Sequence, residues 1–115
     1  LMAGKCNSFT FVGLPGNPVS SMVCSHVFLG PMIKKMLGLE YEKVKTTKYP
    51  LTHELAKNSS REHYMRALIK GDKVTVQSNQ DSASTSILQS SNALVVRPPF
   101  DKSKKSNDLV NVIKL

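Results

Sequence analysis

The stretch GLPGNPVSS, Gly13–Ser21, joins an apolar run to a long amphipathic segment and holds two prolines and two glycines. Pro15 fixes its φ and Gly16 is free to take a positive φ, which together meet the requirement of a type II turn. Asn17 suits a helix N-cap. Pro18 suits the first helical position, because no hydrogen bond there needs its missing N–H. We therefore predict a strand, a tight turn and a capped helix, in that order.

The sequence on either side of this stretch supplies the strand and the helix. Before it, residues 9–14 (FTFVGL) are apolar and rich in aromatic and β-branched side chains, which is typical of a buried strand. After it, apolar side chains recur at helical spacing as far as Leu37, and Gly38 suits a C-cap. Pro31 lies inside this helix and cannot donate to the carbonyl of Val27, so we expect a kink or break there.

The start of this helix is a candidate anion site. The N–H groups of Val19, Ser20 and Ser21 have no partner in the first turn of a helix, and they lie at the positive end of its dipole with two hydroxyls alongside. That geometry favours a negatively charged ligand. The alternative is an ordinary strand-to-helix connection, because serine is common in first turns for capping reasons alone.

The sequence changes in character after Gly38. Residues 39–49 are polar and rich in lysine, which indicates a linker and domain boundary running into an edge strand before Pro50. The segments that follow predict a hairpin of strands 61–70 and 73–78 that turns at Gly71-Asp72. They also predict a serine-rich loop leading to a short helix over 80–91, and two further strands over 94–97 and 108–115. Five short strands with one small helix predict a small barrel or half-barrel, and the fold class is α+β.

Composition narrows the classes of function. The chain has 16 Lys and Arg against 8 Asp and Glu, and its formal charge of +8 attracts nucleic acid, acidic lipid headgroups or phosphorylated small molecules. Cys6 and Cys24 lie far apart, so neither a disulfide framework nor a metal cage is indicated, and reduced thiols in a cytoplasmic protein fit best. No apolar run reaches the length that spans a bilayer, so we expect no membrane partner.

Several of these segments resemble one known family in their order and spacing. GLPGNPVSS, followed by a helix with a proline inside it and a closing LG at 37–38, is similar to the signature of the MoeA/gephyrin family, the molybdopterin molybdenumtransferases. REHYMRALI at 61–69, the glutamine-led QDSAS at 80–84 and SNALVVRPP at 91–99 follow in the order of that family's C-terminal domain. The resemblance covers nearly the whole chain.

The resemblance implies a domain organisation and an activity. Residues 1–39 resemble the last strand and helix of the family's third, α/β domain, whose fold is molybdopterin-binding-like, and residues 43–115 resemble its fourth, β-barrel domain. Family members are homodimeric enzymes that insert molybdate into adenylylated molybdopterin with magnesium, releasing AMP. The acidic catalytic residues of the third domain have no counterpart here. We therefore expect a proteolytic or cloned fragment that is inactive by itself, with no catalytic residue and no magnesium ligand of its own.

The resemblance also implies substrate contacts in a cleft between the two domains. It assigns binding of molybdate or molybdopterin to seven residues: Gly16, Asn17, Pro18, Ser20, Ser21, Arg61 and Ser82. Arg61 would offer an oxyanion a forked, permanently charged donor, and the alternative is an ordinary surface arginine. Ser82 matches a serine that helps to hold molybdate, but Asp81 and Ala83 stand where the family often has glycine.

Two other classes of function stay open. A small β-barrel with a charge of +8 could bind RNA or single-stranded DNA, but 6% aromatic residues and the lack of aromatic pairs along a strand argue against a stacking platform. The other is a scaffold role, because gephyrin also anchors membrane receptors through this region. The interpretation that the residues favour is a cytoplasmic, homodimeric enzyme of molybdenum cofactor biosynthesis.

Overall fold

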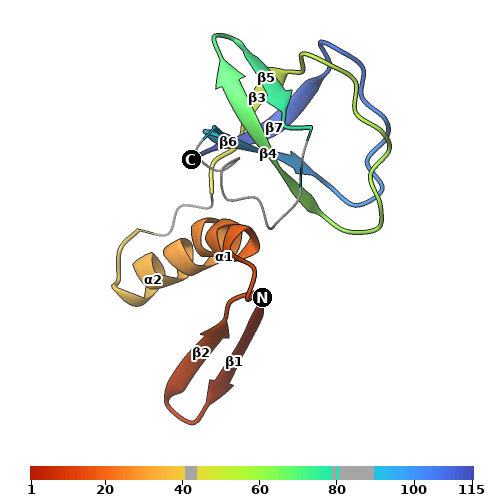
Figure 1. Cartoon of the computed structure of the whole chain (residues 1–115). Helices are drawn as coiled ribbons and strands as arrows, with labels where there is room; N and C mark the ends of the chain where they lie inside the picture. Colours follow the sequence, from red (N-terminus) through yellow and green to blue (C-terminus); the bar gives the residue numbers. More distant parts are fainter. Residues whose placement is uncertain (41–43, 79, 81–89) are drawn as a thin grey trace. The chain divides into compact units, whose positions relative to one another are not determined.

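The computed structural model describes residues 1–40, 44–78, 80 and 90–115 (Figure 1). The described residues up to Val44 form one compact unit, and those from Lys45 onward form another. None of the helices in the described parts of the chain is long and apolar enough to cross a membrane.

The first unit begins with an antiparallel hairpin of β1 (Met2–Cys6) and β2 (Phe9–Gly13). β2 is the strand predicted over 9–14, but the prediction that it is buried is wrong. Phe9 is 76% exposed and Phe11 is 46% exposed. The reason is that β2 belongs to a two-stranded sheet, which by itself has little surface to bury.

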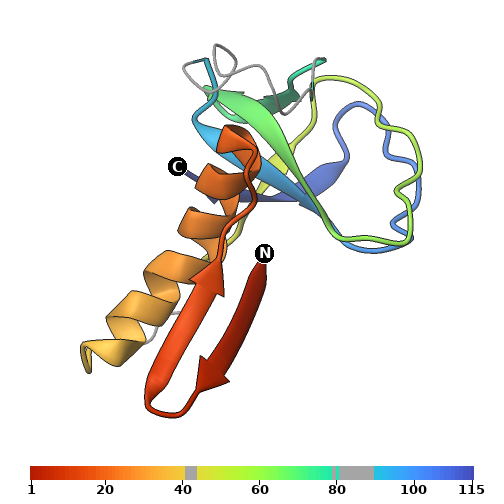
Figure 2. The ribbon, with the colours of Figure 1, turned by 60° about the horizontal axis from the view of Figure 1, so that its bottom comes forward.

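Three helical segments then follow one another along one rod: α1 (Pro18–Cys24), the π-helical η1 (Ser25–Leu29) and α2 (Gly30–Met36) (Figure 2). The predicted break near Pro31 takes the form of this π-helical turn. Pro31 has no N–H to bond with Val27, and the N–H of Gly30 reaches back five residues to the carbonyl of Ser25. The helical path continues through the turn because the wider ring accommodates the proline.

Both ends of the rod carry caps. At the C-terminal end Gly38 takes a φ of 72°, and the N–H groups of Gly38 and Leu39 bond to the carbonyls of Lys35 and Lys34 at 3.1 and 3.0 Å. This pair of bonds is the Schellman motif, so the predicted glycine C-cap is confirmed. At the N-terminal end Asn17 is the cap and Pro18 is the first helical residue, also as predicted.

The turn before the helix differs from the prediction. Among the described glycines, Gly38 and Gly71 have positive φ, so Gly16 lies outside the left-handed region that a type II turn needs at its third residue. Asn17 is extended, with φ −76° and ψ 125°. An extended conformation is what the ring of the following Pro18 imposes on the residue before it. The strand therefore reaches the helix through an extended corner instead of a type II turn.

The second unit is one antiparallel sheet with strand order β3-β7-β6-β4-β5. Its strands are β3 (Thr47–Pro50), β4 (His63–Lys70), β5 (Lys73–Val76), β6 (Ala93–Arg97) and β7 (Leu109–Lys114). The sheet curls until its edges approach each other (Figures 1 and 2). Leu51, directly after β3, forms a parallel bridge with Val74 of β5, and the N–H of Thr52 donates to the carbonyl of Val74 at 3.0 Å. The α+β class and the five-stranded, barrel-like domain are confirmed.

The concave side of this sheet holds the core. The hairpin of β4 and β5 turns at Gly71, with φ 63°, and directs Ala67, Val74 and Val76 inward, as the alternating pattern predicted. Met65 and Ile69 pack partly against the same cluster. Its buried members come from every strand of the sheet or the turn beside it: Leu51, Ala67, Val74, Val76, Ala93, Val95, Val110 and Val112.

Candidate functional site

The first N–H groups of the helix donate to Asn17, the N-cap residue. Oδ1 of Asn17 accepts from the N–H of Val19 at 3.0 Å and from the N–H of Ser20 at 3.2 Å. The backbone carbonyl of Asn17 accepts from the N–H of Ser21 at 2.8 Å. The three amides that the sequence offered to an anion therefore have acceptors within the chain, and that part of the anion hypothesis needs correction. The partly exposed Ser20 and Ser21 keep their hydroxyls as donors at this corner.

Gly16 is exposed and has open space around its Cα. A Cβ added there would meet no atom within 4 Å, and the φ of Gly16 is not positive. Neither backbone conformation nor packing within the first unit therefore requires glycine at this position. Close approach of a ligand to the backbone is a further reason for which glycine is used at a helix start.

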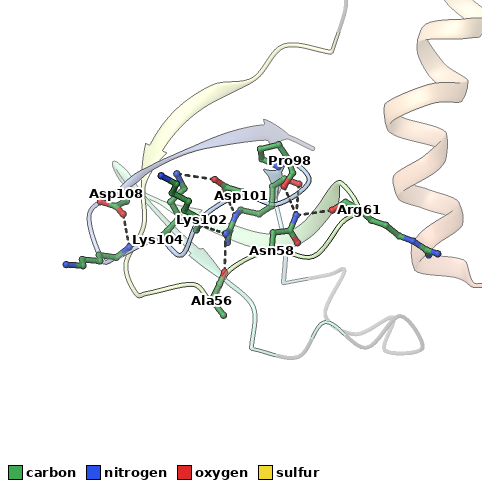
Figure 3. A network of polar contacts seen from close by, with 10 residues as sticks. Ala56, Asn58, Arg61, Pro98, Asp101, Lys102, Lys104 and Asp108 are labelled. Carbon is green, nitrogen blue, oxygen red and sulfur yellow. Dashed lines mark hydrogen bonds and ion pairs between the residues drawn. The ribbon is translucent and has the colours of Figure 1, made fainter.

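Arg61 lies on the loop that leads into β4, and its backbone is held by Asn58. Nδ2 of Asn58 donates to the carbonyl oxygens of Arg61 at 2.9 Å, Arg97 at 3.1 Å and Pro98 at 2.7 Å. The N–H of Asn58 donates to the carbonyl of Asp101 at 2.9 Å. Figure 3 shows the side chain of Arg61 extending away from this network. An exposed arginine thus projects from a backbone that the Asn58 side chain links to the end of β6.

An ion pair between the buried Arg97 and the partly buried Asp101 organises the segment to which Asn58 binds. Arg97 is 2% exposed, and its Nε donates to Oδ2 of Asp101 at 2.6 Å. Its Nη2 donates to the carbonyls of Ala56 at 3.1 Å and Lys102 at 2.9 Å. Nζ of Lys104 lies 3.4 Å from Oδ1 of Asp101. A buried guanidinium is stable here because a carboxylate and two carbonyls together satisfy it.

This half-barrel, with its exposed Arg61, lies within a known sequence family. The family model of the MoeA C-terminal region (domain IV) matches residues 48–115, which is more than half of the chain. The chain belongs to this family. The match covers β4 to β7 as well as the loop of Asn58 and Arg61.

Solved structures agree with this assignment at the level of fold. The molybdopterin biosynthesis moeA protein from Pyrococcus horikoshii OT3 matches with a TM-score of 0.74 and 22% identity, over 87% of this chain and 26% of that one. A molybdenum cofactor biosynthesis protein from Pyrococcus furiosus gives 0.74 and 22%, over 87% and 36%. A second moeA structure from Pyrococcus horikoshii gives 0.79 and 20%, over 97% and 28%. The MoeA C-terminal chain therefore spans between 26% and 36% of these proteins.

The structure places the predicted site residues of this MoeA C-terminal chain in two groups. Gly16, Asn17, Pro18, Ser20 and Ser21 are neighbours at the helix start of the first unit. Arg61 belongs to the second unit. Ser82 lies outside the described residues. The cleft between the two groups stays a prediction.

Gln80 is fixed to β4 two positions before Ser82. Oε1 of Gln80 accepts from the N–H of Arg66 at 3.0 Å, and Nε2 donates to the carbonyls of Arg66 at 3.1 Å and Gln77 at 2.7 Å. The amide side chain thus pairs with β4 as a strand residue would, beyond the end of β5. Beside it opens a cavity of about 490 Å³ with polar and apolar side chains in its wall, lined by His53, Leu55, Met65, Thr75, Val76, Gln77, Ser78 and Gln80.

Magnesium finds no set of protein ligands in the described parts of this MoeA C-terminal chain. No group of three or more His, Cys, Asp or Glu side chains comes together there. Magnesium prefers oxygen ligands, which carboxylates or substrate phosphates supply. We therefore assign no step to a metal held by the described residues.

Sequence reasoning did not find the residues that hold Arg61. Asn58 stands in an unremarkable polar run, and Asp101 begins the lysine-rich stretch between two predicted strands. The available signal was the spacing of Arg97 and Asp101, which lie four residues apart on either side of Pro98-Pro99. A rigid proline pair between opposite charges favours a loop that closes on itself, but only the folded chain shows that Arg97 is buried.

Proposed function

We propose that this chain contributes to an enzyme that inserts molybdate into adenylylated molybdopterin and releases AMP. Membership of the MoeA C-terminal family supports a role in molybdenum cofactor biosynthesis. One observation carries the proposal to the level of residues: Arg61 is exposed, and its backbone is held in place by Asn58. A fixed and permanently charged donor of this kind suits an oxyanion such as molybdate.

The proposed contribution of Arg61 is electrostatic and positional. The planar guanidinium forms two parallel hydrogen bonds with an oxyanion and neutralises part of its charge. A donor whose backbone is already ordered loses little further freedom when substrate arrives, and such preorganisation lowers a reaction barrier. Arg61 binds and orients molybdate in this proposal, and it neither attacks the substrate nor transfers a proton.

The helix start and Ser82 complete the proposed substrate contacts. Asn17 already accepts the first amides of the helix, so the donors left to a phosphate or molybdate oxygen at this corner include the hydroxyls of Ser20 and Ser21. Gly16 and Pro18 would shape the approach of substrate to the backbone. We also propose that the natural protein works as a homodimer on adenylylated molybdopterin and molybdate, with magnesium as the accompanying ion.

The test uses the natural full-length protein that contains this chain, with purified adenylylated molybdopterin, molybdate and magnesium. AMP release that depends on molybdate is measured for the wild type, for Arg61→Ala and for Arg61→Lys. We expect Arg61→Ala to lower kcat/KM for molybdate by about 10- to 100-fold, the range for losing a charge-assisted pair of hydrogen bonds. Lysine keeps the charge without the fork, so Arg61→Lys restores part of the rate.

The matched control is Lys57→Ala, which removes an exposed positive charge from the same loop. We expect this variant to release AMP at the wild-type rate. Equal losses of kcat/KM for molybdate in Lys57→Ala and Arg61→Ala would mean that positive charge in general, and not a specific contact of Arg61, accounts for the effect. A wild-type protein that releases no AMP, but binds random oligonucleotides with strong dependence on salt, would instead favour the nucleic-acid alternative.

A further inference from the structure

The carboxamide of Asn58 is the point at which three separate carbonyls converge. Its Nδ2 carries two hydrogens and lies within 3.1 Å of the carbonyl oxygens of Arg61, Arg97 and Pro98. Two of these acceptors belong to the end of β6 and the residue after it, and the third belongs to the residue three positions later in its own loop. Asn58 therefore ties the loop of Arg61 to the sheet through a single side chain.

Backbone bonds make the same connection on either side. The N–H of Asn58 donates to the carbonyl of Asp101 at 2.9 Å, and the N–H of Phe100 donates to the carbonyl of Ser59 at 2.8 Å. The segment that receives these bonds is itself anchored by the buried pair of Arg97 and Asp101. The loop of Asn58 thus rests on a part of the unit that is fixed by a buried ion pair.

Arg61 is the residue that this arrangement places. Its carbonyl is held by Asn58, while its guanidinium makes no hydrogen bond or ion pair with the described residues. His63, two residues later, already pairs with Arg97 in the ladder of β4 and β6. The backbone of Arg61 is therefore fixed on both sides and its side chain is left exposed for another partner (Figure 3).

We propose that Asn58 is a positioning residue for Arg61, which acts by holding the Arg61 backbone where the guanidinium meets the molybdate oxyanion. This inference rests on the proposed function, because it needs Arg61 to bind molybdate. Asn58 itself touches no substrate. Loss of the Asn58 carboxamide leaves Arg61 present and charged, but lets its backbone adopt more conformations. The guanidinium is then aligned with molybdate in a smaller fraction of the molecules.

The experiment measures KM for molybdate and kcat separately in the natural full-length protein. Asn58→Ala removes the three bonds, and Asn58→Asp keeps the shape but places an oxygen against three carbonyl oxygens. We expect KM for molybdate to rise about three- to tenfold in Asn58→Ala, and further in Asn58→Asp, with kcat nearly unchanged. The control is Asn111→Ala, because the exposed Asn111 carboxamide on β7 bonds to none of the described residues. Its KM stays at the wild-type value.

A double-mutant cycle separates positioning from general stability. If Asn58 works through Arg61, adding Asn58→Ala to Arg61→Ala raises KM no further. A merely structural role would raise KM by the same factor in both backgrounds, and that result overturns the inference. Where Asn58→Ala does not fold, Asn58→Ser retains one donor and replaces it in the cycle, with an expected rise of about two- to threefold.

The outcomes also distinguish this inference from the proposed function. A wild-type protein that releases no AMP in response to molybdate would overturn the proposed function. Wild-type KM and kcat in Arg61→Ala would leave that activity standing, but would remove the role of Arg61 and the positioning role of Asn58 with it. A strong loss in Arg61→Ala, together with wild-type KM in Asn58→Ala and Asn58→Asp, would leave the function standing and overturn only the positioning role.

Discussion

Residues 1–40 bury a single hydrophobic side chain, Val19, whereas every other buried hydrophobic side chain of the described chain lies between Leu51 and Ile113. In the first unit Met36 and Leu37 are 68% and 69% exposed at the end of the helix. In the second unit a connected cluster fills the concave side of the sheet. The two units have regular secondary structure in common, but among the residues that the structure describes only those of the second form a core.

The difference shows two ways in which one chain holds its shape. The first unit relies on local interactions, which are the Asn17 cap, the Schellman motif at Gly38 and a hairpin between neighbouring strands. The second relies on contacts between distant parts of the sequence, such as Arg97 with Ala56 and Leu51 with Val74. Local interactions are each worth about 1 kcal/mol, whereas a core side chain contributes several times as much. Substitutions in the core of the second unit should therefore lower the free energy of unfolding more than matched substitutions in the first unit.

The largest contrast should come from one leucine in each unit. Leu51 is fully buried, and Leu51→Ala should lower the free energy of unfolding by about 3 kcal/mol through lost burial and the cavity that remains. Leu37→Ala removes the same atoms from an exposed position and should change it by less than about 0.5 kcal/mol. Urea unfolding of the 115-residue chain, followed by circular dichroism, measures both. Similar losses in the two variants would mean that the contrast in burial does not govern stability.

The next contrast lies within the second unit, between a partly buried and an exposed carboxylate. Asp101→Asn leaves the buried Arg97 guanidinium with neutral partners, and it should lower the free energy of unfolding by about 2 kcal/mol. The control is Asp108→Asn, since the Asp108 carboxylate accepts only from the exposed backbone N–H of Lys105 among its described contacts. An amide oxygen can replace that acceptor, so the loss should stay below about 0.5 kcal/mol. Equal urea midpoints for the two variants would refute a stabilising role for the buried pair.

The smallest contrast compares two glycines of the first unit. Gly38→Ala forces a side chain into the left-handed conformation at φ 72° and should destabilise the helix end by about 1 kcal/mol. Gly16→Ala meets no atom within 4 Å and no positive φ, so it should change stability by less than about 0.5 kcal/mol. Hydrogen exchange of the helix amides reports both substitutions. Faster exchange in Gly16→Ala than in Gly38→Ala would contradict this assignment of the two glycines.

Features that depend on a few consecutive residues could be predicted from the sequence. The Asn17 cap, the break at Pro31, the Gly38 C-cap and the hairpin at Gly71 all follow from the conformational limits of single residue types. The exception is the type II turn at Pro15-Gly16, where the restriction that Pro18 places on Asn17 decided the local path. The strand over 9–14 was predicted correctly as a strand, but burial depends on what covers it, which a short pattern does not contain.

The sequence by itself determined the order of the elements, the inward face of the β4–β5 hairpin and the resemblance to the MoeA family, because periodicity, turn chemistry and motif order are properties of neighbouring positions. The tertiary structure alone decided that Asn58 holds the backbone of Arg61. It alone decided that Arg97 is buried against Asp101 and the carbonyl of Ala56. Arg97 and Ala56 are 41 positions apart, and their meeting depends on how the whole sheet curls. A pattern of neighbouring residues contains no information about a contact between positions so far apart in the sequence.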